Sequence, residues 1–233
     1  MSDEKSPLFE PLEVVQATTG ENPSASVIWL HGLGADGHDF EPIVPDLKLP
    51  GGPALRFIFP HAPVRPVTIN AGYPMRAWYD IRSIDRSAPS DIEGIEGSME
   101  AVRGLIENEE ARGIATDRIV LAGFSQGGGI ALNTALRYPR ALAGVIGLST
   151  WVPGIDDLEA EIHPANASTP LFLAHGSQDP MVPEAHGRDS ADKLEALGYP
   201  VTWHSYPMMH SVCPEEIIAI RDWLVARLAS APD

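Results

Sequence analysis

Apolar, strand-forming runs recur along the chain, with amphipathic segments between them. Several of these runs are continuously apolar rather than alternating, which is typical of strands that are covered on both faces of a sheet. The predicted strands are SASVIWL (24–30), ALRFIFP (54–60), RIVLAGF (118–124), ALAGVIGLS (141–149), TPLFLAHG (169–176) and PVTWHSY (200–206).

Helices are predicted between and after these strands. In the segment 91–113, apolar residues recur at steps of three and four, which predicts a helix with one buried stripe. A last helix is expected to begin at Pro214, with acidic residues in its positively charged first turn, and to reach Leu228. This alternation predicts an α/β fold in which residues 1–233 form one domain around a mostly parallel sheet with helices on both faces. Residues 1–10 are expected to form a flexible N-terminal tail.

The segment 60–80, PHAPVRPVTINAGYPMRAWYD, departs from this pattern. It is rich in proline, yet it carries the aromatic residues Tyr73, Trp78 and Tyr79. A long loop in a compact domain is usually functional or disordered, and aromatic side chains argue against disorder. We therefore expect a functional loop here.

The charge of the chain excludes several kinds of partner. Asp and Glu number 32 against 16 Lys and Arg, and the net charge of −16 repels phosphate backbones and anionic headgroups. We expect no nucleic-acid partner. No apolar run approaches the roughly 20 residues that span a bilayer, and the N-terminus lacks the apolar core of a signal peptide, so we expect no stable membrane insertion and a cytoplasmic location.

Metal and cofactor motifs are missing from the sequence. The only thiol is Cys213, which leaves no disulfide within the chain and no cysteine-rich zinc site. Neither H-E-x-x-H nor G-x-x-x-x-G-K-[ST] occurs. We expect no metal and no cofactor.

The most informative motif is Gly123-Phe-Ser125-Gln-Gly127, which fits G-x-S-x-G. The five residues alone are weak evidence, but a predicted strand ends at the first glycine and a segment rich in small residues follows the serine. That context is typical of a nucleophile elbow, a sharp strand-to-helix turn that exposes a reactive serine. The alternative is a serine that only caps an ordinary helix.

A serine hydroxyl needs a base to activate it and an acid to orient that base. In α/β-hydrolases these follow the serine in the order acid, then histidine. Asp179 comes directly after the strand 169–176, at the edge where open sheets place their sites, whereas Asp156 and Asp157 lie in a polar connection with no clear strand before them. Asp179 is the better candidate for the acid.

His210 is the best candidate for the base, because it lies on the loop between the last strand and the last helix. His204 falls inside a predicted strand, and His186 falls in a helical pattern.

The stretch His31-Gly-Leu33-Gly34 follows the first predicted strand. Together with Gly37, its glycines also fit the dinucleotide fingerprint G-x-G-x-x-G, but the next strand ends without the acidic residue that would hold a ribose. A hydrolase needs a second backbone N–H, besides that of the residue after the serine, to stabilise the oxyanion. The N–H groups of Leu33 and Gln126 are the predicted donors.

The chain resembles the phospholipase/carboxylesterase family of α/β-hydrolases, which also holds the acyl-protein thioesterases. The resemblance rests on LHGLGADGHDF, GFSQGGG, HGSQDPMVP and MHSVCPEE, and it extends from about Leu12 to Leu228. It implies a triad of Ser125, Asp179 and His210 in an α/β-hydrolase fold without a large cap domain.

The resemblance also implies that the loop from about Pro63 to Trp78 covers an acyl-binding groove. Trp78, Trp151 and Met181 are candidates for lining this groove, and core or edge packing is the alternative for each. Met209, beside the histidine, is bulkier than the residue expected there, which bears on the width of the acyl pocket. By analogy with the family, we expect a weak homodimer.

The predicted function is hydrolysis of carboxylic esters through an acyl-enzyme intermediate. The substrate would be a small-molecule or lipid-like ester. Acyl-protein thioesterase or lysophospholipase activity is the alternative, and a binding protein without catalytic activity on the same fold is a further one.

Overall fold

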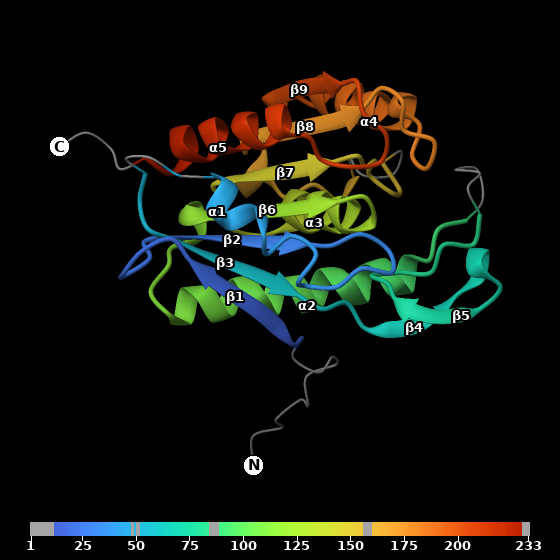
Figure 1. Ribbon diagram of the computed structural model, residues 1–233, viewed down its shortest axis with the longest axis horizontal. Helices are drawn as coiled ribbons and strands as arrows, with labels where there is room; N and C mark the ends of the chain where they lie inside the picture. The colour runs from blue at the N-terminus through green and yellow to red at the C-terminus, as the bar shows by residue number, and fades with distance from the viewer. Residues whose placement is uncertain (1–11, 48, 50–51, 84–88, 156–159, 230–233) are drawn as a thin grey trace, which may run out of the picture.

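The structure, a computed structural model, describes residues 12–47, 49, 52–83, 89–155 and 160–229. In this part of the chain seven strands form one sheet in the order β1-β3-β2-β6-β7-β8-β9 (Figure 1). The strands are β1 (Val14–Thr18), β2 (Ala25–Leu30), β3 (Leu55–Pro60), β6 (Ile119–Phe124), β7 (Gly144–Leu148), β8 (Leu171–Gly176) and β9 (Val201–Tyr206). All neighbouring pairs are parallel except β1 with β3.

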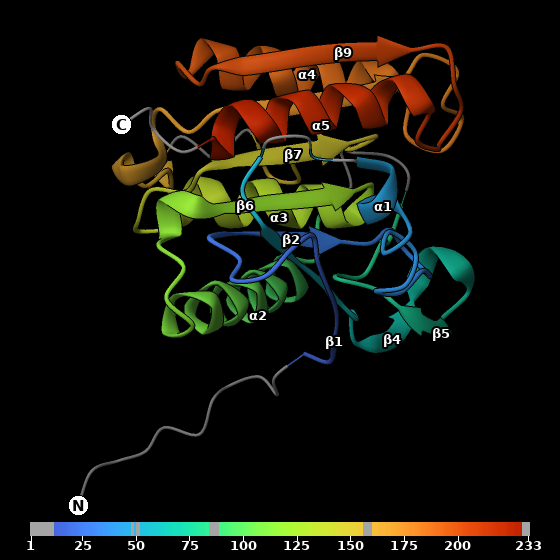
Figure 2. The same cartoon turned by 60° about the vertical axis from the view of Figure 1, so that its left-hand side comes forward.

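Helices cover both faces of this sheet (Figure 2). They are α1 (Ile43–Leu47), α2 (Ile92–Ala111), α3 (Gln126–Arg137), α4 (Glu184–Ala196) and α5 (Pro214–Leu228). Helices α2, α3 and α4 share one apolar core with one side of the sheet, and α1 and α5 share a second core with the other side. The continuous apolar runs predicted this double covering, because a strand buried on both faces has no polar side.

The predicted strands correspond to β2, β3, β6, β7, β8 and β9, with ends within three residues of the predicted ones. Helix α2 lies inside the predicted range 91–113, and α5 has the predicted bounds. Strand β1 was not predicted. It pairs with β3 alone, at the edge of the sheet, and its partly exposed residues carry little of the apolar signal of a buried strand. The predicted tail, residues 1–10, lies outside the described residues.

The segment 60–80 is more ordered than a loop. It contains a hairpin of β4 (Val64–Val67) and β5 (Tyr73–Arg76), joined through a 3₁₀ turn, η1 (Thr68–Asn70). Prolines at positions 66 and 74 stand opposite each other in this hairpin and hid its strand pattern. Figure 1 shows the hairpin beyond the carboxyl ends of the parallel strands.

A buried carboxylate joins helix α2 to the sheet. Glu109 is 1% exposed, and its Oε2 accepts hydrogen bonds from Ser26 Oγ at 2.5 Å and from Arg56 Nη1 at 2.9 Å. Its Oε1 accepts from Arg112 Nη1 at 3.1 Å. The carboxylate therefore satisfies donors from β2, β3 and the end of α2 at once.

Helix α3 approaches the sheet through a residue without a side chain. A Cβ added to Gly127 would lie 2.5 Å from the carbonyl oxygens of both Leu30 and His31. Real Cβ atoms do not come this close to backbone, so any larger residue would push α3 away from the end of β2. Gly127 thus fixes the distance between the first turn of α3 and the loop that follows β2.

We expect Glu109→Ala to destabilise the protein by about 3 kcal/mol, because it leaves a buried donor and a partly buried guanidinium without their acceptor. Urea unfolding of the purified protein measures this loss. The control is Glu100→Ala, which removes an exposed ion pair with Arg103 on the same helix and should cost under about 1 kcal/mol. Equal losses in the two variants would show that the buried contacts contribute no more than surface ones.

Gly127→Ala should cost about 1–3 kcal/mol or more, because backbone atoms must move to admit the methyl group. Gly104→Ala is the matched control: Gly104 lies inside α2 with nothing within 4 Å of an added Cβ, so alanine should stabilise the helix by up to about 1 kcal/mol. Thermal unfolding compares the two variants. A Gly127→Ala protein as stable as wild type would contradict the close approach of α3.

Candidate active site

Ser125 occupies the turn between β6 and α3, as the nucleophile-elbow motif predicts. Its backbone has φ 54° and ψ −122°, a conformation that residues with a side chain rarely adopt. Hydrogen bonds hold it there: the Ser125 N–H donates to Leu148 O at 2.8 Å, and its carbonyl accepts from Thr150 Oγ1 at 2.6 Å. The strand before the serine, the helix after it and the end of β7 together impose the turn.

Asp179 lies in the loop after β8 and is 8% exposed. Its Oδ1 accepts the backbone N–H groups of Met181 at 2.8 Å and Val182 at 2.9 Å. Its Oδ2 lies 2.6 Å from Nδ1 of His210, on the loop between β9 and α5. One oxygen of the carboxylate is thus fixed by the main chain, and the other faces the imidazole.

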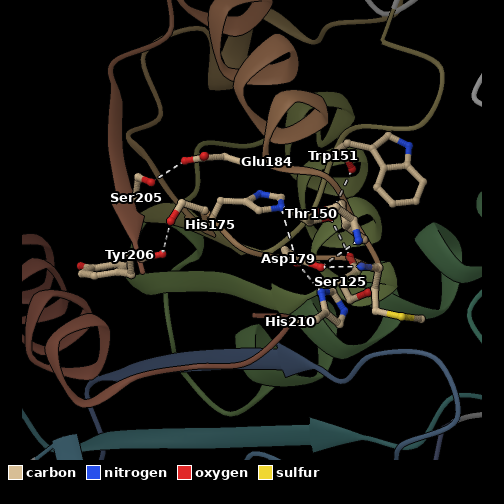
Figure 3. A network of polar contacts seen from close by, with 12 residues as sticks. Ser125, Thr150, Trp151, His175, Asp179, Glu184, Ser205, Tyr206 and His210 are labelled. Atoms are coloured by element: carbon tan, nitrogen blue, oxygen red, sulfur yellow. Dashed lines mark hydrogen bonds and ion pairs between the residues drawn. The ribbon is translucent and has the colours of Figure 1, made fainter. Parts of the chain in front are cut away.

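The His210 ring lies beside the elbow. Its centroid is 4.6 Å from the ring centroid of Phe124, the residue before Ser125. Figure 3 shows Ser125, His210 and Asp179 converging from three separate loops at one edge of the sheet. In the described part of the chain, no hydrogen bond joins the Ser125 hydroxyl to the ring. Such bonds are commonly long when no substrate is bound.

The contact with Asp179 fixes the tautomer of His210. An ionised carboxylate only accepts hydrogen bonds, so Nδ1 must carry the proton and donate it. Nε2 is then left with its lone pair. A neutral imidazole in this tautomer can accept a proton from a hydroxyl group.

A second histidine, His175, contacts the Asp179 loop. It is 1% exposed, and its Nε2 lies 2.8 Å from Val182 O and 3.6 Å from Asp179 Oδ2. Since a carbonyl oxygen accepts, Nε2 donates. Burial lowers the pKa of His175, which keeps the ring neutral at its strand end. The sequence analysis missed this residue, although a histidine inside the apolar run TPLFLAHG is a signal that could have revealed it.

The loop after β2 lies against the elbow. A Cβ added to Gly32 would be 3.5 Å from Ser125 Cβ. His31 shapes this loop: its Nε2 accepts the Ala62 N–H at 3.0 Å, so its Nδ1 carries the proton and donates to Gly32 O at 2.7 Å. Burial lowers the pKa of His31, which favours this neutral form. Gly34 adopts φ 78°, and its N–H donates to Arg76 O at 2.8 Å.

The two predicted oxyanion donors remain unused within the protein. Across the described residues, neither the Leu33 N–H nor the Gln126 N–H has a hydrogen-bond partner. Gln126 is the first residue of α3, where helix N–H groups have no partner inside the helix. Both N–H groups are therefore available to an oxygen atom from outside the chain.

Trp78, predicted to line a substrate groove, lies in the core next to the elbow, and its contact with a substrate remains a prediction. Its side chain is fully buried, and its Nε1 donates to His31 O at 2.9 Å. Its backbone N–H donates at 2.8 Å to Oε1 of Gln126, whose Nε2 donates to Tyr79 O at 2.7 Å. Trp78 and the Gln126 side chain thus tie the elbow to the loop after β2 from inside the core.

The other predicted groove residues are accessible. Met181 is 70% exposed next to Asp179, and Met209 is 64% exposed next to His210. Trp151 is partly buried after β7, with its ring centroid 6.5 Å from that of His186. Their contact with a substrate remains a prediction.

Metal ligation finds no support in the described residues, where no group of three or more His, Cys, Asp or Glu side chains could hold an ion. No described helix is long and apolar enough to cross a bilayer.

The chain is similar in sequence and structure to several known proteins. The chain is 38% identical over 214 residues to acyl-protein thioesterase 1 of Gibberella zeae, covering 88% of this chain and 91% of the relative. It is 41% identical over 221 residues to acyl-protein thioesterase 1 of Neurospora crassa, covering 90% and 89%. The crystal structure of Zea mays acyl-protein thioesterase 2 superposes with a TM-score of 0.82 at 33% identity, covering 92% of this chain and 99% of that one.

These neighbours share the α/β-hydrolase fold, which confirms the predicted fold class. Residues 11–228 match the family described as Phospholipase/Carboxylesterase. The chain therefore belongs to the phospholipase/carboxylesterase family of α/β-hydrolases.

Proposed function

We propose that the protein is a serine hydrolase that cleaves carboxylic esters through an acyl-enzyme intermediate on Ser125. The observation that carries this proposal is the contact of 2.6 Å between His210 Nδ1 and Asp179 Oδ2, beside a serine held at positive φ. A base with a fixed tautomer next to a partly exposed nucleophile is the arrangement that acyl transfer requires. Membership of a hydrolase family supports the same reaction class.

In the first half of the reaction, the hydroxyl oxygen of Ser125 attacks the carbonyl carbon of the ester, and His210 Nε2 takes the hydroxyl proton. Asp179 stabilises the imidazolium that forms. The same proton then passes to the leaving alcohol, and the acyl group remains on Ser125. In the second half, water attacks the acyl-enzyme, gives its proton to His210, and releases the carboxylic acid and the free serine.

The N–H groups of Leu33 and Gln126 are proposed to bind the oxyanion in both halves. Removal of one such donor typically costs about 2.7–4 kcal/mol of transition-state stabilisation. The side chain of Gln126 and the indole of Trp78 are proposed to keep these two donors in position, because they join the elbow to the loop after β2 by hydrogen bonds.

Acyl-protein thioesterase activity is the second candidate function, since the similar proteins from Gibberella zeae and Neurospora crassa bear that name. The same atoms serve both reactions, and only the leaving group differs. Exposed Met181 and Met209 flank the proposed acid and base and are proposed, with Trp151, to contact the acyl chain under the segment 63–78. We also propose a cytoplasmic location and a weak homodimer.

Paired substrates with the same acyl chain and either an alcohol or a thiol leaving group test both functions. We expect the highest kcat/KM on short-chain esters, and Ser125→Ala should lower kcat on every substrate by at least about 10⁴-fold. A peak at long-chain thioesters would favour the second candidate. Ser125→Ala protein that folds normally and retains wild-type turnover would overturn the assignment of the nucleophile.

A further inference from the structure

A cavity of about 370 Å³ is lined by neither the proposed triad nor the proposed oxyanion donors. Its wall is formed by the residues before β1, the connection from β3 to β4, the hairpin, Trp78 and helix α2. Two arginines, Arg65 and Arg76, lie on this wall with His61. Leu12 and Ala101 add apolar surface, and the buried Trp78 borders the cavity.

Within the described part of the chain, neither arginine forms an ion pair with an acidic residue. Of the twelve arginines that the structure describes, eight form an ion pair with Asp or Glu within 4.0 Å, and Arg65 and Arg76 are two of the four that do not. This is unexpected in a chain that carries twice as many acidic as basic residues. Two unpaired guanidinium groups on one cavity wall create a local positive field inside an acidic protein.

Arg65 is also incompletely hydrogen-bonded. Its Nε is buried without a partner in the described residues. Arg76 donates through Nη1 to Ala62 O at 2.8 Å, and this carbonyl does not neutralise its charge. A buried donor without an acceptor is costly, so an acceptor in the cavity would remove that cost.

Two acidic residues lie near these arginines. Among the described residues that line the cavity, Glu13 is the acidic one. The Asp91 carboxylate lies next to Gly94, on the same side as Arg65 Nη1. It accepts the N–H groups of Asp80 and Gly94 at 2.8 and 3.3 Å. In the described residues it forms no ion pair with Arg65 within 4.0 Å.

His61 adds a third donor. Its Nδ1 accepts the Gly37 N–H at 3.1 Å, so in the neutral ring the proton lies on Nε2. The described residues that line the cavity thus include two arginines, one histidine and one glutamate.

We propose that this cavity binds a small organic anion, whose carboxylate or phosphate group pairs with Arg65 and Arg76 and whose apolar part lies against Leu12 and Ala101. The guanidinium fork matches both oxyanions. The volume is within the range of small-molecule sites, near its lower end, which favours a ligand with a single small apolar group, such as one aromatic ring, beside the charged group.

The cavity is connected to the loop after β2 by hydrogen bonds. Arg76 O accepts the Gly34 N–H at 2.8 Å, and the Ala62 N–H donates to His31 Nε2 at 3.0 Å. Trp78 is among the residues that line the cavity, and its indole donates to His31 O. We therefore expect its Nε1–H resonance to shift when the cavity is occupied.

Calorimetric titration of the full chain with phenyl phosphate, benzoate and inorganic phosphate tests the proposal. Ser125→Ala protein is titrated in parallel to detect contact with the hydroxyl. Because the N–H groups of Leu33 and Gln126 remain in that variant, the arginine variants below decide between the cavity and the proposed oxyanion site. We expect phenyl phosphate or benzoate to bind once per chain in both proteins, to bind more tightly than inorganic phosphate, and to shift the Trp78 indole resonance.

The variants Arg65→Gln and Arg227→Gln locate the site. Both remove one unpaired arginine, but Arg227 is exposed at the end of α5, away from the cavity. Arg65→Gln should weaken binding at least about tenfold, Arg65→Lys should weaken it less, and Arg227→Gln should change it less than twofold, with thermal unfolding confirming that each variant folds. The proposal would be overturned by any of three results: no saturable binding, equal effects of the two glutamine variants, or equal affinity for phenyl phosphate and inorganic phosphate. None of these measurements depends on esterase activity, so the cavity proposal can fail or hold independently of the proposed function.

Discussion

The site depends on a single backbone turn in an unfavourable conformation. A serine at φ 54° is strained, and it persists only where the surrounding structure leaves it no alternative. The close packing of α3 on β6 and β2 provides that constraint, because Gly127 brings backbone to within contact distance of Leu30 and His31. The strain is balanced by two cores that hold the sheet between helices on both faces. The packing that stabilises the fold therefore also fixes the position of the proposed nucleophile.

The parallel sheet explains why residues far apart in sequence meet here. The strands β2, β6 and β8 point their carboxyl ends toward the same edge, so the loops that follow them carry His31, Ser125 and Asp179 to that edge (Figure 1). Two buried histidines then act on these loops rather than on a substrate: His175 holds the Asp179 loop, and His31 holds the loop with the proposed oxyanion donor. Both stay neutral because burial lowers the pKa of each.

The sequence predicted the parts of the fold that are governed by local pattern. Buried strands read as continuous apolar runs, and α5 was predicted from its first-turn proline and acidic residues. The sequence did not predict β1 or the proline-containing hairpin. These elements are stabilised by hydrogen bonds to a partner strand rather than by their own composition. Trp78 was a candidate for lining the groove through the resemblance to the family. That its indole N–H donates to the buried carbonyl of His31 could not be predicted from the sequence, because this contact depends on the tertiary structure.

The central claim is that Ser125 becomes covalently acylated with the help of His210. The most direct measurement is reaction with a fluorophosphonate, followed by mass spectrometry of the intact chain and its peptides. The account predicts one adduct per chain, located on the peptide that contains Ser125, and much slower labelling in His210→Ala protein. An adduct on a different residue, or labelling that proceeds as fast without the imidazole, would contradict it.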